Sequence, residues 1–283
     1  MVSRIVICKK VLFYLAIILL CAIIISPFIL LISYSLKSNA EIFSFRPQLI
    51  PIKPTLVSYK NVIFSYKVGG STFVTWTLNS LIVCGAATAI SILFASLAGY
   101  SLSRFQFQGK SIVWSIVILI QTLPLIIVLI SFYILLGRFH MLDSLWSLFL
   151  SYIMVFIPVG IWLFQGFFQA TSREIEDAAR IDGCSYFGVF WRIVFPLAIP
   201  GALAIGLFCF VVGWSDYLFA SVIIRSSKNW TLPLGLMSFQ GEYNILWGEI
   251  MAGSTLITVP IVILFLYLQR YLIKGLMAGS VKG

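Results

Sequence analysis

Residues 171–196 read TSREIEDAARIDGCSYFGVFWRIVFP, and this stretch is a polar interruption in an otherwise apolar chain. Four of the nine acidic residues lie in it, namely Glu174, Glu176, Asp177 and Asp182. Carboxylates are costly inside lipid, so this segment must face water or a protein partner. A chain that concentrates its acidic groups in one loop has a candidate docking site there.

The rest of the chain has the composition of a membrane protein. Of its 283 residues 61% are hydrophobic and 10% charged, with a mean hydropathy of +1.07, against roughly 25% charged residues in soluble domains. The apolar intervals reach the ~20 residues that a spanning helix needs. We therefore expect an all-α integral membrane protein, a single domain over residues 1–283. Its six transmembrane helices are predicted near 11–36, 74–101, 112–136, 145–170, 196–219 and 250–272, with a helix-turn-helix loop at 171–195 and a tail at 273–283.

Basic residues bear on orientation and on partners. An even number of spans places both termini on one side, and eleven of the nineteen Lys and Arg residues fall on that side against eight on the other. The positive-inside rule therefore favours cytoplasmic termini. The net charge of +10 fits attraction to an anionic lipid leaflet, whereas the lack of an extended basic patch argues against nucleic acid binding. One His and five Cys without CxxC spacing argue against a metal site.

Small residues recur at four-residue spacing in the second predicted span. Gly85 and Ala89 form one such pair, and Ala95 and Gly99 form another. This spacing lets two helix backbones approach closely. The sequence leaves open whether the neighbouring helix belongs to the same chain or to another subunit.

Local signals predict two short helices inside the 171–195 loop. Thr171 and Glu174 have the spacing of a capping box, so a helix is expected to begin near Ser172. It should end near Ile181, because Gly183 can adopt the positive φ of a helix stop. Ser185 can cap a second helix that runs toward Pro196. Such a motif suits docking, and the plain alternative is a solvated loop at the membrane surface.

The motif Asp177-Ala178-Ala179, followed by Gly183 and by residues 193–196 (IVFP), resembles the EAA loop of ATP-binding-cassette importer permeases. Asp replaces the usual first Glu, a role that the neighbouring Glu176 can share, and Phe195 replaces the usual Leu. Further segments look like the carbohydrate-uptake branch, and specifically its maltose-system-type smaller permease. These are 79–81, 104–110, 196–201, 214–217 and the tail 275–283.

The resemblance implies a function and a set of partners. The chain would be a permease of an ATP-driven importer in the bacterial cytoplasmic membrane, moving a sugar or oligosaccharide delivered by an extracytoplasmic binding protein. It would pair with a homologous second permease and sit on two ATPase subunits, which would bind ATP and Mg, so that this chain would need no catalytic residue, cofactor or metal. The 171–195 loop and both termini would be cytoplasmic.

Particular residues are expected to carry these roles. The ATPase-coupling residues implied by the resemblance are Glu176, Asp177, Ala178, Ala179, Asp182 and Gly183. The tail, through Gly279, Lys282 and Gly283, would contact the ATPases. With three glycines and no apolar periodicity, residues 274–283 are not expected to form a helix on their own.

Polar and aromatic groups within the spans are candidates for the substrate pathway. They are Asn79, Gln121, Trp214, Ser215, Asp216 and Tyr217, with Tyr152 and Gln165 as further members. Asp216 is the strongest candidate among these residues, since an acidic group at the end of a span is a functional candidate. Anchoring of Trp and Tyr at the membrane interface explains the 214–217 group equally well. The family usually has Asn where Ser215 stands.

Other functions remain open from the sequence. A permease of the same class could carry glycerol-3-phosphate or another polyol-like solute. A stand-alone secondary carrier would be expected to hold mid-span carboxylates and an inverted repeat, which the sequence does not display. An intramembrane enzyme is disfavoured by the single His and the lack of HExxH and GxSxG motifs.

Overall fold

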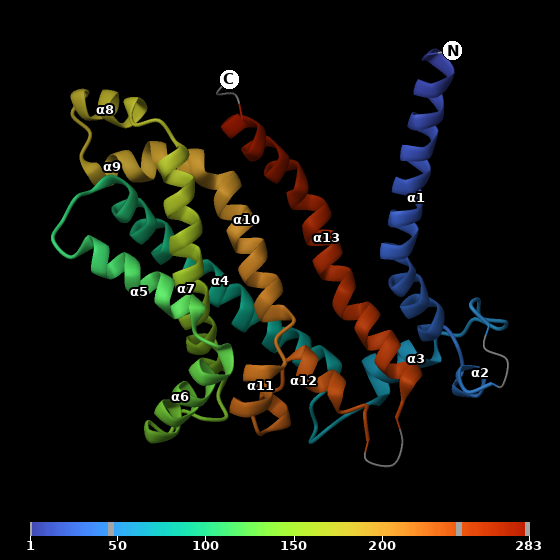
Figure 1. The fold of residues 1–283 in the computed structure, drawn as a ribbon. Coiled ribbons are helices and arrows are strands. Elements are labelled where there is room, and N and C mark those ends of the chain that lie inside the picture. Colours follow the sequence, from blue (N-terminus) through green and yellow to red (C-terminus); the bar gives the residue numbers. More distant parts are fainter. Residues whose placement is uncertain (1, 45–47, 242–244, 281–283) are drawn as a thin grey trace. The chain divides into compact units, whose positions relative to one another are not determined.

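The computed structural model describes residues 2–44, 48–241 and 245–280, and this part of the chain is helical (Figure 1). Only two isolated β-bridges, Val68 with Ser71 and Gln240 with Ile245, occur within those ranges. The helices are α1 Val2–Ser35, α2 Asn39–Ile42, α3 Val57–Lys60, η1 Asn61–Ser65, α4 Phe73–Arg104, α5 Lys110–Thr122, α6 Leu125–Arg138, α7 Leu145–Ala170, α8 Glu174–Ile181, α9 Tyr186–Val189, η2 Phe190–Val194, α10 Phe195–Trp214, α11 Leu218–Ile223, η3 Ser227–Asn229, α12 Leu232–Met237 and α13 Trp247–Ser280.

Five stretches of helix in the described ranges are long and apolar enough to cross a membrane. They are Lys9–Ser35, Phe73–Arg104, Leu145–Ala170, Tyr186–Trp214 and Trp247–Tyr271. The third span expected from the sequence, 112–136, is instead divided into α5 and α6, which are bent by 102° relative to each other. The break lies at Pro124, which lacks an N–H group and holds Leu123 in an extended conformation.

The chain divides into two compact units. The first contains the residues up to Tyr66 together with Leu236–Val259. Within it, Asn61 Nδ2 donates to Glu249 Oε1 at 3.0 Å, and Tyr66 donates its hydroxyl to the Ser238 carbonyl at 2.7 Å. These bonds connect the region after α1 to the first turn of α13 and to the segment before that helix.

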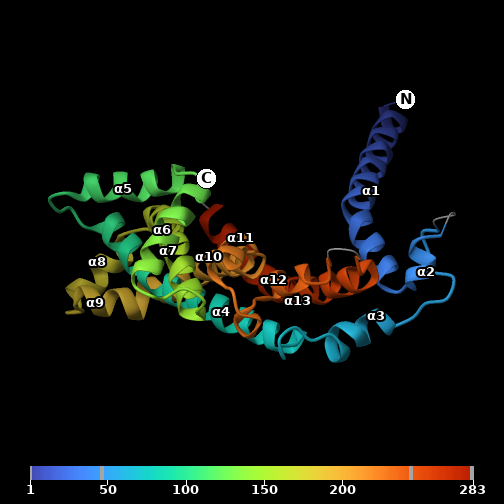
Figure 2. The same ribbon diagram turned by 90° about the horizontal axis from the view of Figure 1, so that it is seen from below.

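The second unit comprises Lys67–Gly235 and the residues from Pro260 onward. In it α4 packs along α7, and α10 lies against both (Figures 1 and 2). The approach of α4 to α7 is close, because a Cβ built on Gly99 would lie 2.8 Å from Phe164 Cβ and one built on Gly160 would lie 2.7 Å from Ala95 Cβ. The Ala95–Gly99 pair therefore packs within the chain. At the other pair Ala89 is exposed and a Cβ on Gly85 would meet no atom within 4 Å.

Most of the long helices contain a proline. Pro27 lies in α1, Pro158 in α7, Pro200 in α10 and Pro260 in α13. Of the helices of twenty residues or more in the described ranges, α4 alone contains no proline.

The described part of the C-terminal tail is an extension of α13. Residues 274–280, expected not to be helical by themselves, continue α13 as far as Ser280. Extending an existing helix avoids the cost of nucleation, so a segment too weak to form a helix alone can still propagate one. The backbone of Gly279 lies in this extension, whereas Lys282 and Gly283 lie outside the described residues.

Candidate functional site

The 171–195 loop forms a helix-turn-helix whose first helix is α8. The predicted capping box is wrong, because α8 begins at Glu174 and Thr171 instead ends α7. As a result, the Thr171 hydroxyl donates back to the Phe167 carbonyl at 3.1 Å, and Ser172 Oγ accepts from the Glu174 N–H at 3.3 Å. A threonine at a helix C-terminus readily makes this bond to the preceding turn.

The turn between the two helices matches the sequence prediction. Gly183 has φ of +89°, the left-handed conformation that glycine adopts without a Cβ penalty. The Gly183 N–H donates to the Arg180 carbonyl at 3.1 Å and the Cys184 N–H to the Ala179 carbonyl at 3.0 Å. This pair of bonds is the Schellman ending of a helix. Ser185 Oγ accepts from the Gly188 N–H at 3.1 Å and so caps α9, as expected.

Beyond α9 the chain enters the membrane-spanning helix without a break. A π-helical turn, η2, joins α9 to α10, so that Tyr186–Trp214 is one continuous helical stretch. Pro196 stands in the first turn of α10, directly after the π-helical turn. The second helix of the motif is therefore the beginning of a spanning helix.

The six residues predicted to contact a partner divide into two sets. Asp177, Ala178, Asp182 and Gly183 are exposed, whereas Glu176 and Ala179 are buried. The sequence did not indicate that apolar side chains share the exposed surface. Ile175 is 50% exposed, Ile181 87% and Phe187 67%. The surface that this motif offers to a partner thus combines carboxylates with large apolar side chains.

Glu176 is held by the C-terminal end of α4. Its Oε1 forms an ion pair with Arg104 at 2.7 Å, and its Oε2 accepts from the Tyr100 hydroxyl at 2.8 Å. The side chains of Arg104 and Glu176 are only 6% and 8% exposed. We refer to Tyr100, Arg104 and Glu176 as the Glu176 cluster. Tyr100 and Arg104 could not be recognised as site residues from the sequence, because 76 and 72 residues separate them from Glu176.

Two more bonds attach the start of the loop to α4. Arg104 Nη2 donates to the Thr171 carbonyl at 3.1 Å, and Arg173 Nη2 donates to the Ser103 carbonyl at 3.1 Å. Below the Glu176 cluster, the Tyr100 ring packs edge-on against Phe168, with ring centroids 5.6 Å apart, and lies 5.2 Å from the Phe190 ring. A cavity of about 140 Å³ remains beside the cluster, lined by Arg173, Asp177, Arg180 and Tyr186 among others.

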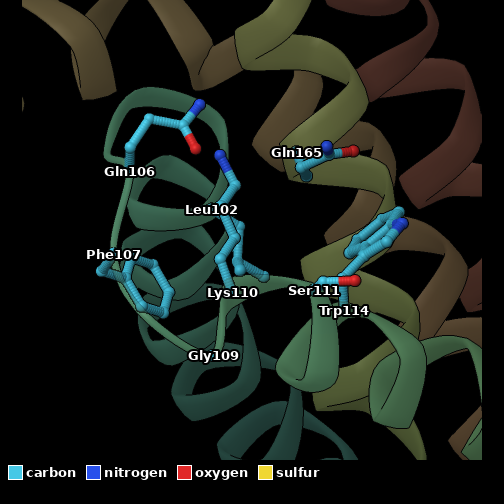
Figure 3. A pocket seen from close by; sticks show the side chains of 8 residues that line it. All are labelled: Leu102, Gln106, Phe107, Gly109, Lys110, Ser111, Trp114 and Gln165. Carbon is cyan, nitrogen blue, oxygen red and sulfur yellow. The ribbon is translucent and has the colours of Figure 1, made fainter.

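A larger cavity, of about 480 Å³, lies where the loop after α4 leads into α5 (Figure 3). Gln106, Phe107 and Lys110 line it from that loop and the first residue of α5, and Trp114 and Gln165 from the helices. The Lys110 ammonium group donates to the Phe105 carbonyl at 2.9 Å. Among the described residues no group of three or more His, Cys, Asp or Glu side chains comes together to hold a metal.

The predicted pathway residues are each engaged with different neighbours. Asn79 donates to the carbonyls of Lys228 and Trp230, both at 2.9 Å, and Gln121 donates to the Val117 carbonyl at 3.1 Å. Neither cavity described above is lined by any of the six predicted residues, although Gln165 lines the larger one.

The residues at 214–217 differ in burial and in their partners. Trp214 is buried and stacks on Phe210, with ring centroids 5.4 Å apart, whereas Ser215 and Tyr217 are exposed. Asp216 is bonded to Tyr152 and to two backbone N–H groups. Of the predicted pathway residues, the structure therefore brings Tyr152 and Asp216 together by a hydrogen bond.

Comparison with known proteins identifies the class. A solved bacterial ABC transporter involved in the import of the acidic polysaccharide alginate has a chain of the same fold, with a TM-score of 0.79, 20% sequence identity, and coverage of 93% of this chain and 96% of that one. The all-α integral membrane fold expected from the sequence, that of an ABC transporter permease, is thus confirmed. Residues 70–277 match the family described as the binding-protein-dependent transport system inner membrane component, and the chain belongs to this family.

Two relatives are similar over most of their length. The arabinooligosaccharides transport system permease protein AraQ of Bacillus subtilis is 32% identical over 257 residues, which cover 91% of this chain and 90% of AraQ. The diacetylchitobiose uptake system permease protein DasC of Streptomyces coelicolor is 34% identical over 247 residues, covering 87% and 88%. The resemblance to importer permeases is confirmed, and the chain is a multi-pass permease subunit of an ABC importer.

Proposed function

We propose that this permease moves a sugar or short oligosaccharide into the bacterial cytoplasm. The names of its relatives support the cargo class, since AraQ and DasC serve arabinooligosaccharides and diacetylchitobiose, and a third relative from Agrobacterium fabrum, 32% identical over 257 residues, serves sulfoquinovosyl glycerol. These names favour a saccharide over glycerol-3-phosphate. An extracytoplasmic binding protein delivers the sugar.

The chain works as one half of a permease heterodimer above two ATPase subunits. The observation that carries this proposal is the helix-turn-helix at 171–195, whose first helix is joined to α4 by the Arg104–Glu176 ion pair. Asp177 and Ala178 on that helix are exposed, as are Asp182 and Gly183 in the turn after it. A narrow, charged knob with exposed Ile181 suits entry into a cleft of an ATPase. ATP and Mg bind to the ATPases, and this chain contributes no catalytic group. The tail, with Gly279, Lys282 and Gly283, lies near the ATPases.

Reconstitution tests this function. The permease, its partner permease, the ATPase and the binding protein are assembled in vesicles, and ATP hydrolysis is measured with arabino-oligosaccharides, diacetylchitobiose and glycerol-3-phosphate. We expect a saccharide, and not glycerol-3-phosphate, to stimulate ATP hydrolysis and to be taken up as ATP is hydrolysed. Uptake driven by a proton gradient without ATP would instead identify a secondary carrier, and stimulation by glycerol-3-phosphate alone would change the cargo class.

Orientation follows from the same proposal, with both termini and the 171–195 loop in the cytoplasm. A cysteine placed at Ser172 should resist an impermeant thiol reagent in intact cells and react after the membrane is opened. Reaction in intact cells would place the loop outside and remove it from the ATPases.

A further inference from the structure

The two adjacent acidic residues of the loop, Glu176 and Asp177, point to different surroundings. Asp177 is exposed, whereas Glu176 is 6% exposed and points to α4. In a helix, neighbouring residues are about 100° apart around the axis, so one can meet a partner while the other contacts its own chain. Glu176 is therefore unavailable to the ATPase that the exposed residues would meet.

The buried carboxylate is fully used within the chain. Arg104 reaches Oε1 through both Nε and Nη2, each at 2.7 Å, and Tyr100 reaches Oε2 at 2.8 Å. A buried charge is costly unless it is paired and hydrogen-bonded, so losing either partner leaves the other uncompensated. The bonds to the carbonyls of Thr171 and Ser103 add two more attachments between the loop and α4.

The loop's other end leads into α10, and there Arg180 of α8 lies over the Tyr186 ring of α9 at 4.0 Å. Toward α10 the chain passes through the Gly183 turn, the four-residue α9 and the π-helical turn η2. π-Helical turns are rare and interrupt the regular register of an α-helix. The buried hydrogen bonds and ion pair of α8 therefore join it to α4.

We propose that Glu176 is a positioning residue which, through Arg104 and Tyr100, makes α8 and the end of α4 move as one body. Force applied by the ATPase at Asp177–Gly183 then enters the membrane-spanning helices through α4. This inference rests on the proposed role of the loop as the ATPase contact. It assigns Glu176 a role in the transmission of movement and leaves the binding of the partner to the exposed residues.

A double-mutant cycle in the reconstituted full complex tests the proposal. Glu176→Gln, Arg104→Gln, their combination and Tyr100→Phe are compared for two readouts: the ATPase retained per permease, and the sugar taken up per ATP hydrolysed. We expect each Gln variant to retain the ATPase while uptake per ATP falls about tenfold, as for loss of a hydrogen bond to a buried charge. The double variant should be no worse than the worse single one, since both remove the same interaction.

Matched variants separate transmission from binding and from folding. Asp177→Lys should lose the ATPase itself, and Arg138→Gln, which changes an exposed arginine at the end of α6, should alter neither readout. Arg104→Lys should recover part of the loss, because it restores the charge without the two-pronged geometry. Tyr100→Phe removes one bond and keeps the ring, so it serves as the mild variant if the Gln variants do not fold.

Two results would overturn the proposal. One is additive losses in the cycle, and the other is loss of the ATPase by Glu176→Gln to the extent seen for Asp177→Lys. Amide hydrogen exchange over residues 174–183 gives a readout that needs no ATPase: the exchange should accelerate in Glu176→Gln and in Tyr100→Phe. Equal exchange in wild type and both variants rejects the positioning role, whereas a wild-type complex without sugar-stimulated hydrolysis rejects the proposed function alone.

Discussion

Asp216 accepts a hydrogen bond at 3.0 Å from the hydroxyl of Tyr152, which joins the turn after α10 to the N-terminal part of α7. The same carboxylate accepts from the N–H groups of Phe219 and Ala220, both at 3.2 Å, and so caps α11. Both oxygens of the carboxylate therefore accept hydrogen bonds from within the chain. Asp216, which the sequence indicated as a candidate for the sugar pathway, thus also has a structural role, and its partner Tyr152 is a second predicted pathway residue.

Replacement of Asp216 with Ala should therefore act on stability. It removes a helix cap and leaves the buried Tyr152 hydroxyl without an acceptor, which together should cost about 2–4 kcal/mol. We expect a lower unfolding temperature for the purified permease, and an unchanged half-saturating sugar concentration in the complexes that assemble. A shift in half-saturation without loss of stability would restore Asp216 to the pathway.

The close contact between α4 and α7 predicts different results at two glycines of one helix. Gly99→Ala places a Cβ 2.8 Å from Phe164 Cβ and 3.0 Å from the Gln165 backbone nitrogen, and overpacking of this kind should cost about 1–3 kcal/mol. Gly85→Ala meets nothing within 4 Å and should be neutral or stabilising by up to about 1 kcal/mol. Thermal unfolding of both purified variants checks this, and equal stability would contradict the packing.

Gly183→Val should weaken the loop through its backbone alone. A Cβ there would meet no atom within 4 Å, but φ is +89°, and a left-handed conformation costs a side-chain-bearing residue about 1–2 kcal/mol. We expect normal membrane insertion with reduced ATPase retention and sugar uptake. Gly183→Asn is the matched control, because Asn tolerates this conformation and should keep most of the activity. Normal uptake by a stably expressed Gly183→Val chain would count against the loop as the ATPase contact.

Asp143 predicts a dependence of stability on acid pH. Burial raises the pKa of this carboxyl, but hydrogen bonds from the side chain and backbone of Ser226 and from the Arg225 N–H outweigh it and lower the pKa to about 2. Because the unfolded value is about 3.9, the stabilisation is fully present above about pH 4 and is lost as the pH falls through about 2.

The Asn variant isolates this charge. Asp143 has φ of +59°, a conformation that Asn also accepts, so Asp143→Asn changes the charge with little backbone strain. We expect the variant to be less stable than wild type at pH 6, with the difference shrinking toward pH 2. Unfolding of the detergent-solubilised permease at several pH values measures it, and a constant difference would remove Asp143 as the source.

The helix ends that depend on local chemistry could be predicted from the sequence. The Gly183 stop and the Ser185 cap follow from residues within one turn of each helix end, and both are present. The start of α8 was misplaced because the Thr171 hydroxyl bonds back to Phe167 at the end of α7, and Ser172 instead accepts from the Glu174 N–H. Length and hydropathy located most of the spans, because a bilayer sets a fixed length for them.

What the sequence did not reveal depends on packing between distant segments. Pro124 is compatible with a straight, a kinked or a divided span, since neighbouring helices decide which of these is stable. The Glu176 cluster joins residues more than seventy positions apart, and no spacing rule connects them. The helical tail was missed because its stability comes from the helix that precedes it.

The absence of proline from α4 has a mechanical consequence. Its 32 residues extend about 48 Å at about 1.5 Å per residue, against a hydrocarbon thickness of about 30 Å. With no proline to bend it, this rod should deliver a displacement at its Arg104 end to its Phe73 end with little loss, as a stiff lever does. The helices α7 and α10, which pack against α4, each contain a proline and should bend more readily than α4 does.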